Sequence, residues 1–482
     1  MNLSHIDKPI AARKAALTYV LTVGAPVAIL LAVIVLGEGI HRVAIHGVAG
    51  TAAIQPQSSG LPNLAILMTQ IGLIVLMSRA VGSIIQRIGQ PRVIGEVLAG
   101  LLLGPSFLGW IAPGLSGVLF PVQSLGFLHA LSQLGLVLFM FMVGLEVDVR
   151  ELYGHGHAAV VISHASIMAP MALGAALSLY LYPRFAGPVA GFAGFALFMG
   201  VAMSITAFPV LARILTERKL LRSRMGAMAI ACAAIGDATG WCVLAYVVAF
   251  VSASHSSIPV WLTVGGLPVF IAITWWAGRW SMRGTEEAWL ADGELSGNRQ
   301  ALLLVFLLAA ALATEALGLH LLFGAFVAGA IIPKHPGFGT YLIEKFEPLT
   351  VLLLLPLFFA YTGLRTSLGQ IRGAQMWGIC LLIIAVAVAG KLGGTGIAAR
   401  LSGFGWRESL ALGSLMNTRG LMELVVLNIG LDIGIISPAI FSMMVVMAIT
   451  TTMMAPPLLD WFHAGSAPAP GRQRTGPDAL TA

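Results

Sequence analysis

The sequence predicts an all-α polytopic membrane protein with about fourteen transmembrane helices. Three observations favour this fold class. Only 10% of the 482 residues are charged and 58% are hydrophobic, whereas a soluble domain is usually about one quarter charged. Apolar runs of about 18 residues or more, long enough to cross a bilayer, recur along almost the whole chain. These runs are continuous rather than alternating, which indicates helices and not a membrane barrel.

The predicted spans follow one another with mostly short loops between them. The first lies near 15–36, behind the basic residues Lys8, Arg13 and Lys14. We expect it to be a retained helix and not a signal peptide, because it is long and no small-residue cleavage pattern follows it. The other spans are expected near 64–83, 91–108, 126–146, 157–182, 188–213, 225–251, 258–278, 299–317, 318–333, 348–364, 375–398, 407–430 and 436–459.

Basic residues in the loops indicate the orientation. The loops at 79–92, 213–224 and 279–299 carry Lys and Arg, although acids balance them in the last. With fourteen spans, these loops and both termini fall on one side, which the positive-inside rule makes cytoplasmic; Arg365 and Arg372 are the exceptions on the other side. The same rule accounts for the net charge of +7, so we expect no nucleic-acid partner. The sequence predicts an integral protein of a bacterial-type inner (cell) membrane.

Composition divides the chain into three parts. Residues 1–62 are expected to form an extra N-terminal transmembrane helix and an external loop, and 63–462 the membrane domain. The tail at 463–482 is rich in Pro, Ala and Gly, and we expect a disordered cytoplasmic segment. The three cysteines, Cys232, Cys242 and Cys380, lie inside apolar runs without disulfide or zinc spacing. No cofactor is expected.

Ionisable residues inside spans are few, because each costs about 2.5–3.5 kcal/mol at the bilayer centre. They are Glu96, Asp237, Glu315, Lys391, Glu423 and, as a borderline case, Arg419. Asp237 and Lys391 lie near the middle of their spans. One interpretation is an ion pair or buried hydrogen bond that only holds helices together. The other is a carboxylate that alternately binds a proton and a cation, with Lys391 as the counter-charge. His164 and His320 are more typical of packing residues.

Two polar breaks interrupt otherwise apolar spans. SITAFPVLARIL (204–215) places Pro209, which lacks a backbone donor, inside a helix beside the hydroxyls of Ser204 and Thr206. LMNTRGLMELVVLNIG (415–430) is the second break. Interrupted spans in corresponding halves of a chain indicate the midplane site of a transporter. We expect Arg419 and Glu423 to pair within the second break, and Glu96 and Glu315 to be structural or to line an access path.

The two halves of the chain share an order of predicted helices. We expect them to form inverted repeats over about 64–251 and 299–459. The helix at 258–278 between them would invert the second half. Counted from the span at 64–83, Pro209 lies in the fifth helix and Asp237 in the sixth. Counted from the span at 299–317, Lys391 falls in the fifth or sixth helix and the break around Asn417 in the next. This relation rests on order and hydropathy alone.

Four motifs resemble the monovalent cation:proton antiporter-2 family over about residues 64–462. They are VIGEVLAGLLLGPSFLGW (93–110), GLVLFMFMVGLEVD (135–148), SITAFPVLARIL (204–215) and MNTRGLMELVVLNIG (416–430). Within the family, the chain looks most like bacterial sodium or potassium/proton antiporters and plant cation/proton exchangers. The resemblance implies a sodium/proton antiporter-like fold, in which a mobile core domain carries two broken, crossing helices. A second domain would join two protomers into a homodimer.

The resemblance also implies site residues. Asp237 matches the ion-binding aspartate, which would hold Na+ or K+ transiently, and Lys391 matches the basic residue opposite it. The other expected ion-site residues are Thr206, Ser204, Asn417 and Thr418, and the expected broken-helix residues are Pro209, Gly236 and Gly420.

One position departs from the family pattern. Relatives usually place Asp or Asn directly before the aspartate, where this chain has Gly236. A single carboxylate favours one-for-one electroneutral exchange, whereas lysine at 391 is associated with charge-moving relatives. Gly236 would also leave room for a larger ion such as K+. The choice between Na+ and K+, the stoichiometry, the direction of flow and the regulation stay open.

Other functions fit the sequence less well. An intramembrane aspartyl protease needs a second aspartate at membrane depth, but Asp148, Asp432 and Asp460 lie at span ends or in a loop. A passive channel needs a filter, and no TVGYG-like segment occurs. A sodium-coupled organic anion transporter of a related fold fits the breaks but not the 415–430 motif. The sequence therefore predicts a secondary active antiporter, not an enzyme, that exchanges Na+ or K+ for H+ by alternating access.

Overall fold

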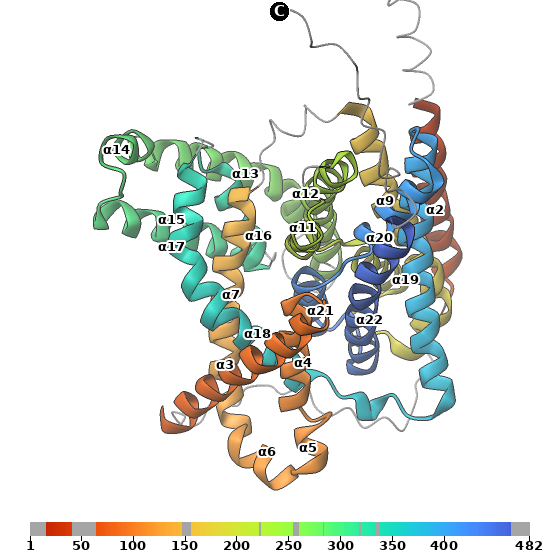
Figure 1. Cartoon of the computed structure of the whole chain (residues 1–482), viewed down its shortest axis with the longest axis horizontal. Helices are drawn as coiled ribbons and strands as arrows, with labels where there is room; N and C mark the ends of the chain where they lie inside the picture. The colour runs from red at the N-terminus through yellow and green to blue at the C-terminus, as the bar shows by residue number, and fades with distance from the viewer. Residues whose placement is uncertain are drawn as a thin grey trace, which may run out of the picture.

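The structure is a computed structural model. It describes residues 16–40, 64–146, 156–220, 223–253, 260–282, 284–317, 320–333, 335 and 337–463. Most of the predicted external loop and nearly all of the predicted tail lie outside the described residues. The described chain is helical, apart from turns and one isolated bridge between Ala186 and Ile436 (Figure 1). The division into three parts and the cytoplasmic location of both termini stay predictions.

Long apolar helices confirm the all-α membrane class. Within the described residues, ten helices are long and apolar enough to cross a membrane, and the bent pair α20 (Trp406–Met416) and α21 (Leu421–Asp432) makes eleven. Three further predicted spans coincide with other helices: α13 (Val260–Ser281), the short α16 (Leu321–Ile331), and the continuous helix of α17 (Phe338–Leu349), η3 (Thr350–Leu354) and α18 (Leu355–Arg365). The count of about fourteen spans stays a prediction.

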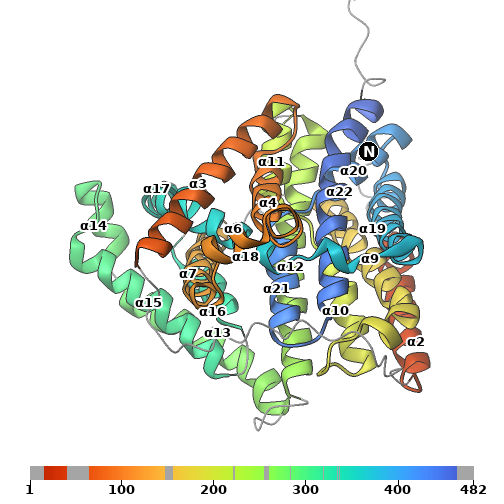
Figure 2. The ribbon, with the colours of Figure 1, turned by 90° about the horizontal axis from the view of Figure 1, so that it is seen from below.

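The helices pack into two bundles (Figures 1 and 2). We call the first the scaffold bundle; it holds α13, α16, α17, η3 and α18 together with α3 (Leu64–Arg87), α4 (Arg92–Leu103), α7 (Val122–Glu146) and α15 (Gly297–Ala316). We call the second the core bundle; it holds α20 and α21 with α9 (Gly156–Phe185), α10 (Phe192–Ser204), α11 (Phe208–Glu217), α12 (Arg224–Ala253), α19 (Gly373–Leu401) and α22 (Pro438–His463). Figure 2 shows the scaffold bundle on the left and the core bundle on the right.

The two halves of the chain have the same helix order. In each half, three scaffold segments precede three core segments, and the fifth segment is broken: α10 and α11 in the first half, α20 and α21 in the second. The predicted place of Lys391 in the fifth or sixth helix of the second half was wrong. Lys391 lies in α19, the fourth segment, because α15 to α18 make up only three. With Lys391 in the fourth segment, each break lies in the fifth segment of its half of the chain.

Glycines allow close helix crossings in the scaffold bundle. At the crossing of α7 and α16, Gly329 packs on the backbone of Phe141, and Gly144 packs on the backbone of Phe326. A Cβ at either position would overlap a backbone carbonyl oxygen. Since backbone van der Waals packing drives helix association in lipid, these glycines set the distance between the two helices.

We expect Gly329→Ala to destabilise the protein by about 1–3 kcal/mol, because the added methyl group meets backbone and not a flexible side chain. Gly378→Ala on α19 is the matched control: this glycine is also helical, is exposed, and has no atom within 4 Å of the built Cβ. The control should be neutral or gain up to about 1 kcal/mol. Thermal unfolding in detergent measures both, and equal midpoints for the two variants would contradict the close crossing.

The N-terminal span packs on the core bundle. The helix Ala16–Gly37, made of a short π-helical segment and α2 (Ala25–Gly37), contacts α9 and α10. Gly37 lies so close to the ring of Phe192 that a Cβ would overlap it. The Tyr19 hydroxyl hydrogen-bonds Nδ1 of His164 at 3.0 Å. His164 is thus a helix-contact residue, in line with the packing role predicted for it.

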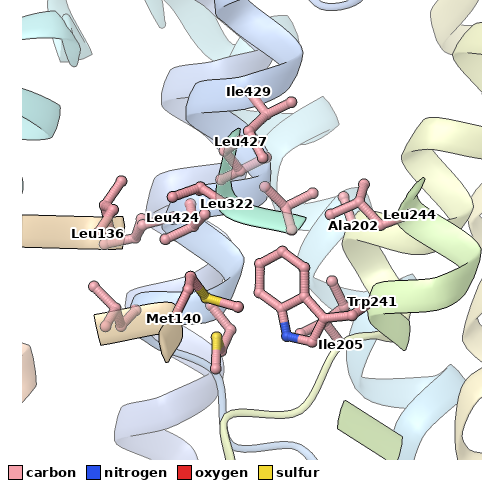
Figure 3. Packing of buried hydrophobic residues seen from close by; sticks show 14 of the residues in the cluster. Leu136, Met140, Ala202, Ile205, Trp241, Leu244, Leu322, Leu424, Leu427 and Ile429 are labelled. Carbon is pink, nitrogen blue, oxygen red and sulfur yellow. The ribbon is translucent and has the colours of Figure 1, made fainter. Parts of the chain in front are cut away.

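Apolar side chains fill the interface between the bundles. Figure 3 shows the indole of Trp241 surrounded by aliphatic side chains. The scaffold contributes Leu136, Met140 and Leu322, and the core contributes Ala202, Ile205, Leu244, Leu424, Leu427 and Ile429. The Trp241 ring also packs on Phe323 and Phe326 of α16, with ring centroids 5.9 and 6.3 Å away. We call this set the apolar seal.

Candidate functional site

The two broken helices meet at their breaks. The first break is the extended segment 205–207. Pro209 lies in the first turn of α11, where backbone N–H groups have no partner within the helix, so its missing N–H costs no hydrogen bond. The Ala207 N–H donates to the Thr418 carbonyl at 3.0 Å, and the Thr206 hydroxyl donates to the Met416 carbonyl at 2.9 Å. These two bonds join the breaks directly. The four half-helix ends therefore lie together inside the core bundle.

Gly420 lies at this meeting point, where space is tight. A Cβ there would lie 3.0 Å from Cγ2 of Val210 and 3.6 Å from Cβ of Ala207, across from the first break. A side chain at this position would therefore require the Val210 side chain to shift. The predicted broken-helix residues Pro209 and Gly420 thus lie at the two breaks. The prediction was wrong for Gly236, which lies within the continuous helix α12.

A buried ion pair lies at the end of α10. Arg419 pairs with Glu423 at 2.7 Å, and both side chains are fully buried. The guanidinium also donates to the carbonyls of Ala202 and Met203, at 3.0 and 2.6 Å. A positive group at a helix C-terminus stabilises the exposed carbonyls there. The predicted pairing of Arg419 with Glu423 is confirmed, whereas the contact of Arg419 with α10 was not predicted.

Thr452 of α22 anchors the second break and was also missed. Its hydroxyl accepts a bond from the Arg419 N–H at 2.9 Å and lies 2.8 Å from the Arg419 carbonyl. A threonine on an apolar helix gives no sequence signal for such a contact, since hydroxyls of helical threonines usually bond their own backbone.

Lys391 is completely buried and is held by hydroxyl groups. Its Nζ donates to Thr206 Oγ1 at 2.7 Å and to Ser166 Oγ on α9 at 3.2 Å. Among the described residues, no carboxylate oxygen lies within 4.0 Å of this ammonium, so the ion pair with Asp237 considered from the sequence is not formed here. Ser166 was not predicted as a partner, because it is a small polar residue on an apolar helix.

Asp237 lies on α12 with only 5% of its surface exposed. Its Oδ1 atom is buried and accepts no hydrogen bond from the described residues. A buried carboxylate oxygen without a donor is costly unless a proton or cation satisfies it. Beside it, Gly236 leaves space: a Cβ there would meet only Ser163 Oγ, at 3.5 Å, an ordinary contact distance.

The remaining predicted ion-site residues lie at the breaks. The hydroxyls of Ser204 and Thr418 donate to the carbonyls of Val201 and Leu415, each at 2.8 Å. Donation leaves their oxygen lone pairs available to a cation. Asn417 is fully buried, and neither its amide oxygen nor its amide nitrogen has a hydrogen-bond partner among the described groups. The direct participation of these residues in ion binding stays a prediction.

A charged cavity of about 310 Å³ leads to the breaks between the bundles. It reaches Ala207 and Pro209 of the first broken helix and Leu421 of the second. Its charged lining residues are Arg79, Arg92, Glu96, Glu146, Arg213 and Glu347. Three of these lie in or beside loops predicted to be cytoplasmic. Glu96 lines the cavity beside Arg92, at 3.4 Å, whereas Glu315 accepts the Leu321 N–H at 3.1 Å, at the start of α16.

Two crossed, broken helices inside a polytopic membrane protein, with a buried aspartate and lysine beside them, define a secondary transporter. The chain belongs to the sodium/hydrogen exchanger family, whose transmembrane model matches residues 72–464.

Relatives cover the same region. The chain is 40% identical over 398 residues to "Na(+)/H(+) antiporter NhaS4" of Synechocystis sp., covering 82% of this chain and 97% of that protein. It is 41% identical to "Cation/H(+) antiporter 17" of Arabidopsis thaliana over 82% of this chain, and spans about half, 48%, of that relative's length. The fold is shared with the sodium proton antiporter MjNhaP1 from Methanocaldococcus jannaschii, with a TM-score of 0.58 and 14% identity, covering 84% of this chain and 98% of that one.

Proposed function

We propose that this chain exchanges a monovalent cation, Na+ or K+, for H+ across a membrane by alternating access. Membership of the sodium/hydrogen exchanger family supports the reaction type. The names of the two relatives, one a Na+/H+ antiporter and one a cation/H+ antiporter, support the substrate class. A transporter of this kind needs no catalytic group and no resident cofactor.

The observation that carries the mechanism is the Oδ1 atom of Asp237, which has no hydrogen-bond partner among the described residues. A proton or a cation satisfies the same oxygen, so the two substrates compete for one carboxylate. Lys391 is close enough to the break to hydrogen-bond Thr206. When Asp237 is ionised and empty, this ammonium balances its charge, and entry of a cation removes the need for that balance.

Some backbone carbonyls at the breaks already accept hydrogen bonds, which leaves fewer backbone ligands for a cation. The carbonyls of Ala202, Met203 and Met416 already accept bonds from Arg419 and Thr206. Side-chain oxygens therefore carry more of the coordination. We assign Asp237 as the main ligand, with Thr206, Ser204, Asn417 and Thr418 as further oxygen donors.

The division into two bundles supports alternating access. Since hydrogen bonds join both breaks within the core bundle, the core would move as one body against the scaffold. The charged cavity would then be the cytoplasmic access path of one state, with both termini on that side. Two protomers would associate through the scaffold bundle in a bacterial-type cell membrane, with lipid covering the remaining apolar surface.

The test is ion-driven dissipation of a proton gradient in proteoliposomes that contain the purified chain. Sodium, potassium and choline chlorides are compared at equal concentration. Movement with sodium or potassium but not with choline supports antiport and names the ion. Equal traces for all three salts would rule out the proposed exchange, and movement only with an added organic anion would indicate the related sodium-coupled carriers.

Ion preference is expected to depend on Gly236. A Cβ is accommodated at this position, because among the described atoms it meets only Ser163 Oγ, at 3.5 Å. An amide beside Asp237 narrows the site and adds a ligand, so we expect Gly236→Asn to raise the selectivity for Na+ over K+ by about 5- to 10-fold. Gly378→Ala serves as the control. The ratio of half-saturating concentrations measures the effect, and an unchanged ratio would refute the idea that Gly236 makes room for a larger ion.

A further inference from the structure

We propose that Arg365, Asn428 and Asp432 form a gate that holds the core against the scaffold at the end opposite the charged cavity. This inference rests on the proposed alternating access. It assigns these three residues to the positioning of the core bundle between its two states. None of them touches the proposed ion site.

The gate is a ladder of polar bonds between α18 of the scaffold and α21 of the core. The Arg365 guanidinium pairs with the Asp432 carboxylate at 2.6 Å and donates to the Asn428 side-chain oxygen at 3.1 Å. One turn earlier on both helices, the Asn428 amide nitrogen donates to the Thr362 hydroxyl at 2.9 Å. Asn428 thus joins both steps of the ladder.

Neighbouring side chains fix the arginine. The Arg365 guanidinium lies over the ring of Tyr361, 5.4 Å from its centroid, and that ring packs on His129 of α7 at 4.8 Å. Only 16% of the Arg365 side chain and 26% of the Asp432 side chain are exposed. An ordered, partly buried ion pair loses less entropy and is less screened than a surface pair. It can therefore contribute to holding two bundles together.

The same two helices line the charged cavity at one end and are joined by polar bonds at the other. Leu355 and Phe359 of α18 and Leu421 of α21 line the charged cavity, while Arg365 and Asp432 are the last residues of these helices. Leu421 and Asp432 are separated by about 16 Å along α21. Both helices thus face the cavity near their first residues and are linked at their last.

The apolar seal lies beside the proposed ion site. Figure 3 shows Trp241 at the centre of the seal. On α12, Trp241 follows Asp237 by one turn and lies farther from the basic loop at 213–224. Asp237 is therefore closed off on the side that the basic loops predict to be external. To open that side, the core must separate from the scaffold there, and the Arg365 ladder must break. The ladder thus sets the balance between the two states.

The experiment measures opening directly, with Leu244→Cys as a reporter inside the seal, where Leu244 is completely buried. The background carries Cys242→Ser, since Cys242 is exposed whereas Cys232 and Cys380 are buried. A membrane-impermeant thiol reagent is added from outside to whole cells, and the labelling rate is followed. Half-saturating cation concentrations are measured in parallel from each side of oriented vesicles.

We expect Asp432→Asn and Arg365→Gln each to raise labelling roughly fivefold, as loss of a partly buried ion pair implies. The half-saturating concentration should fall on the external side and rise on the internal side. Asn428→Leu, which removes the bridge without changing charge, should act in the same direction. The exchanged pair Arg365→Asp/Asp432→Arg should return labelling toward the starting rate, which a general loss of stability would not do.

Asp460→Asn is the matched control. It breaks the 2.9 Å pair with Arg218, which lies wholly within the core bundle, so labelling should not change. The gate is overturned if Asp432→Asn and Arg365→Gln leave labelling and both half-saturating concentrations unchanged while cation-driven flux continues. Absence of flux in every protein, including the unmodified chain, counts against the proposed exchange. Labelling still decides the gate in that case, because it needs no transport.

Discussion

Replacement of Asp237 by asparagine is expected to abolish cation-dependent proton movement, lowering its rate at least about 100-fold. An amide neither releases a proton nor carries the negative charge that balances a cation. Neither substrate can therefore be exchanged at this position. Stability should be unchanged or higher, because no group in the described part of the chain donates a hydrogen bond to the Oδ1 atom of Asp237. The proteoliposome assay measures the rate, and thermal unfolding in detergent measures stability.

Glu217→Gln is the control for this substitution, since Glu217 pairs with Arg213 on the exposed surface of α11 at 3.0 Å. It should keep nearly full activity. Cation-driven proton movement that survives in Asp237→Asn would make the aspartate structural, and the proposed mechanism would be wrong. A variant that neither folds nor transports would contradict the expected stability.

The second large effect is expected at Arg419. Arg419→Met leaves the fully buried carboxylate of Glu423 without its partner and the carbonyls of Ala202 and Met203 without their donor. Breaking one partner of a buried pair typically costs about 3–5 kcal/mol, because a charge remains buried and uncompensated. Denaturant unfolding in detergent should show a loss of this size.

The double variant Arg419→Met/Glu423→Leu separates charge from packing. It removes both charges, so a good part of the stability should return. Arg213→Ala is the surface control, because its pair with Glu217 is more than one third exposed on both side chains and contributes at most about 1 kcal/mol. Equal destabilisation of the single and double Arg419 variants would show that the uncompensated charge is not the cause.

The sequence predicted the features that local chemistry determines. Apolar runs located the helices, and polar residues around Thr206 and Asn417 located both breaks. It did not predict the partners of those residues, because helix contacts depend on how distant segments approach. The hydroxyls of Ser166 and Thr452 look unremarkable on their helices, and only packing brings them to Lys391 and Arg419.

Pro209 illustrates the limit within one segment. Proline indicates that a helix is interrupted, but the residue itself fits the first turn of the following helix. The extended segment therefore lies just before it, at 205–207. The ladder of Arg365 was missed for another reason. Arg365 counted as an exception to the loop-charge pattern, and its partner Asp432 was placed in a loop, although it ends α21.

The N-terminal span rests on α9 and α10 of the core, and much of its apolar surface is exposed. If the core shifts along the membrane normal, this helix moves with it, and its hydrophobic length no longer matches the surrounding lipid in both states. Each Å of difference between the hydrophobic length of a helix and the thickness of the bilayer costs a fraction of about 1 kcal/mol. Acyl-chain length would then act on the exchange equilibrium, and the same chain would favour different states in thin and thick bilayers.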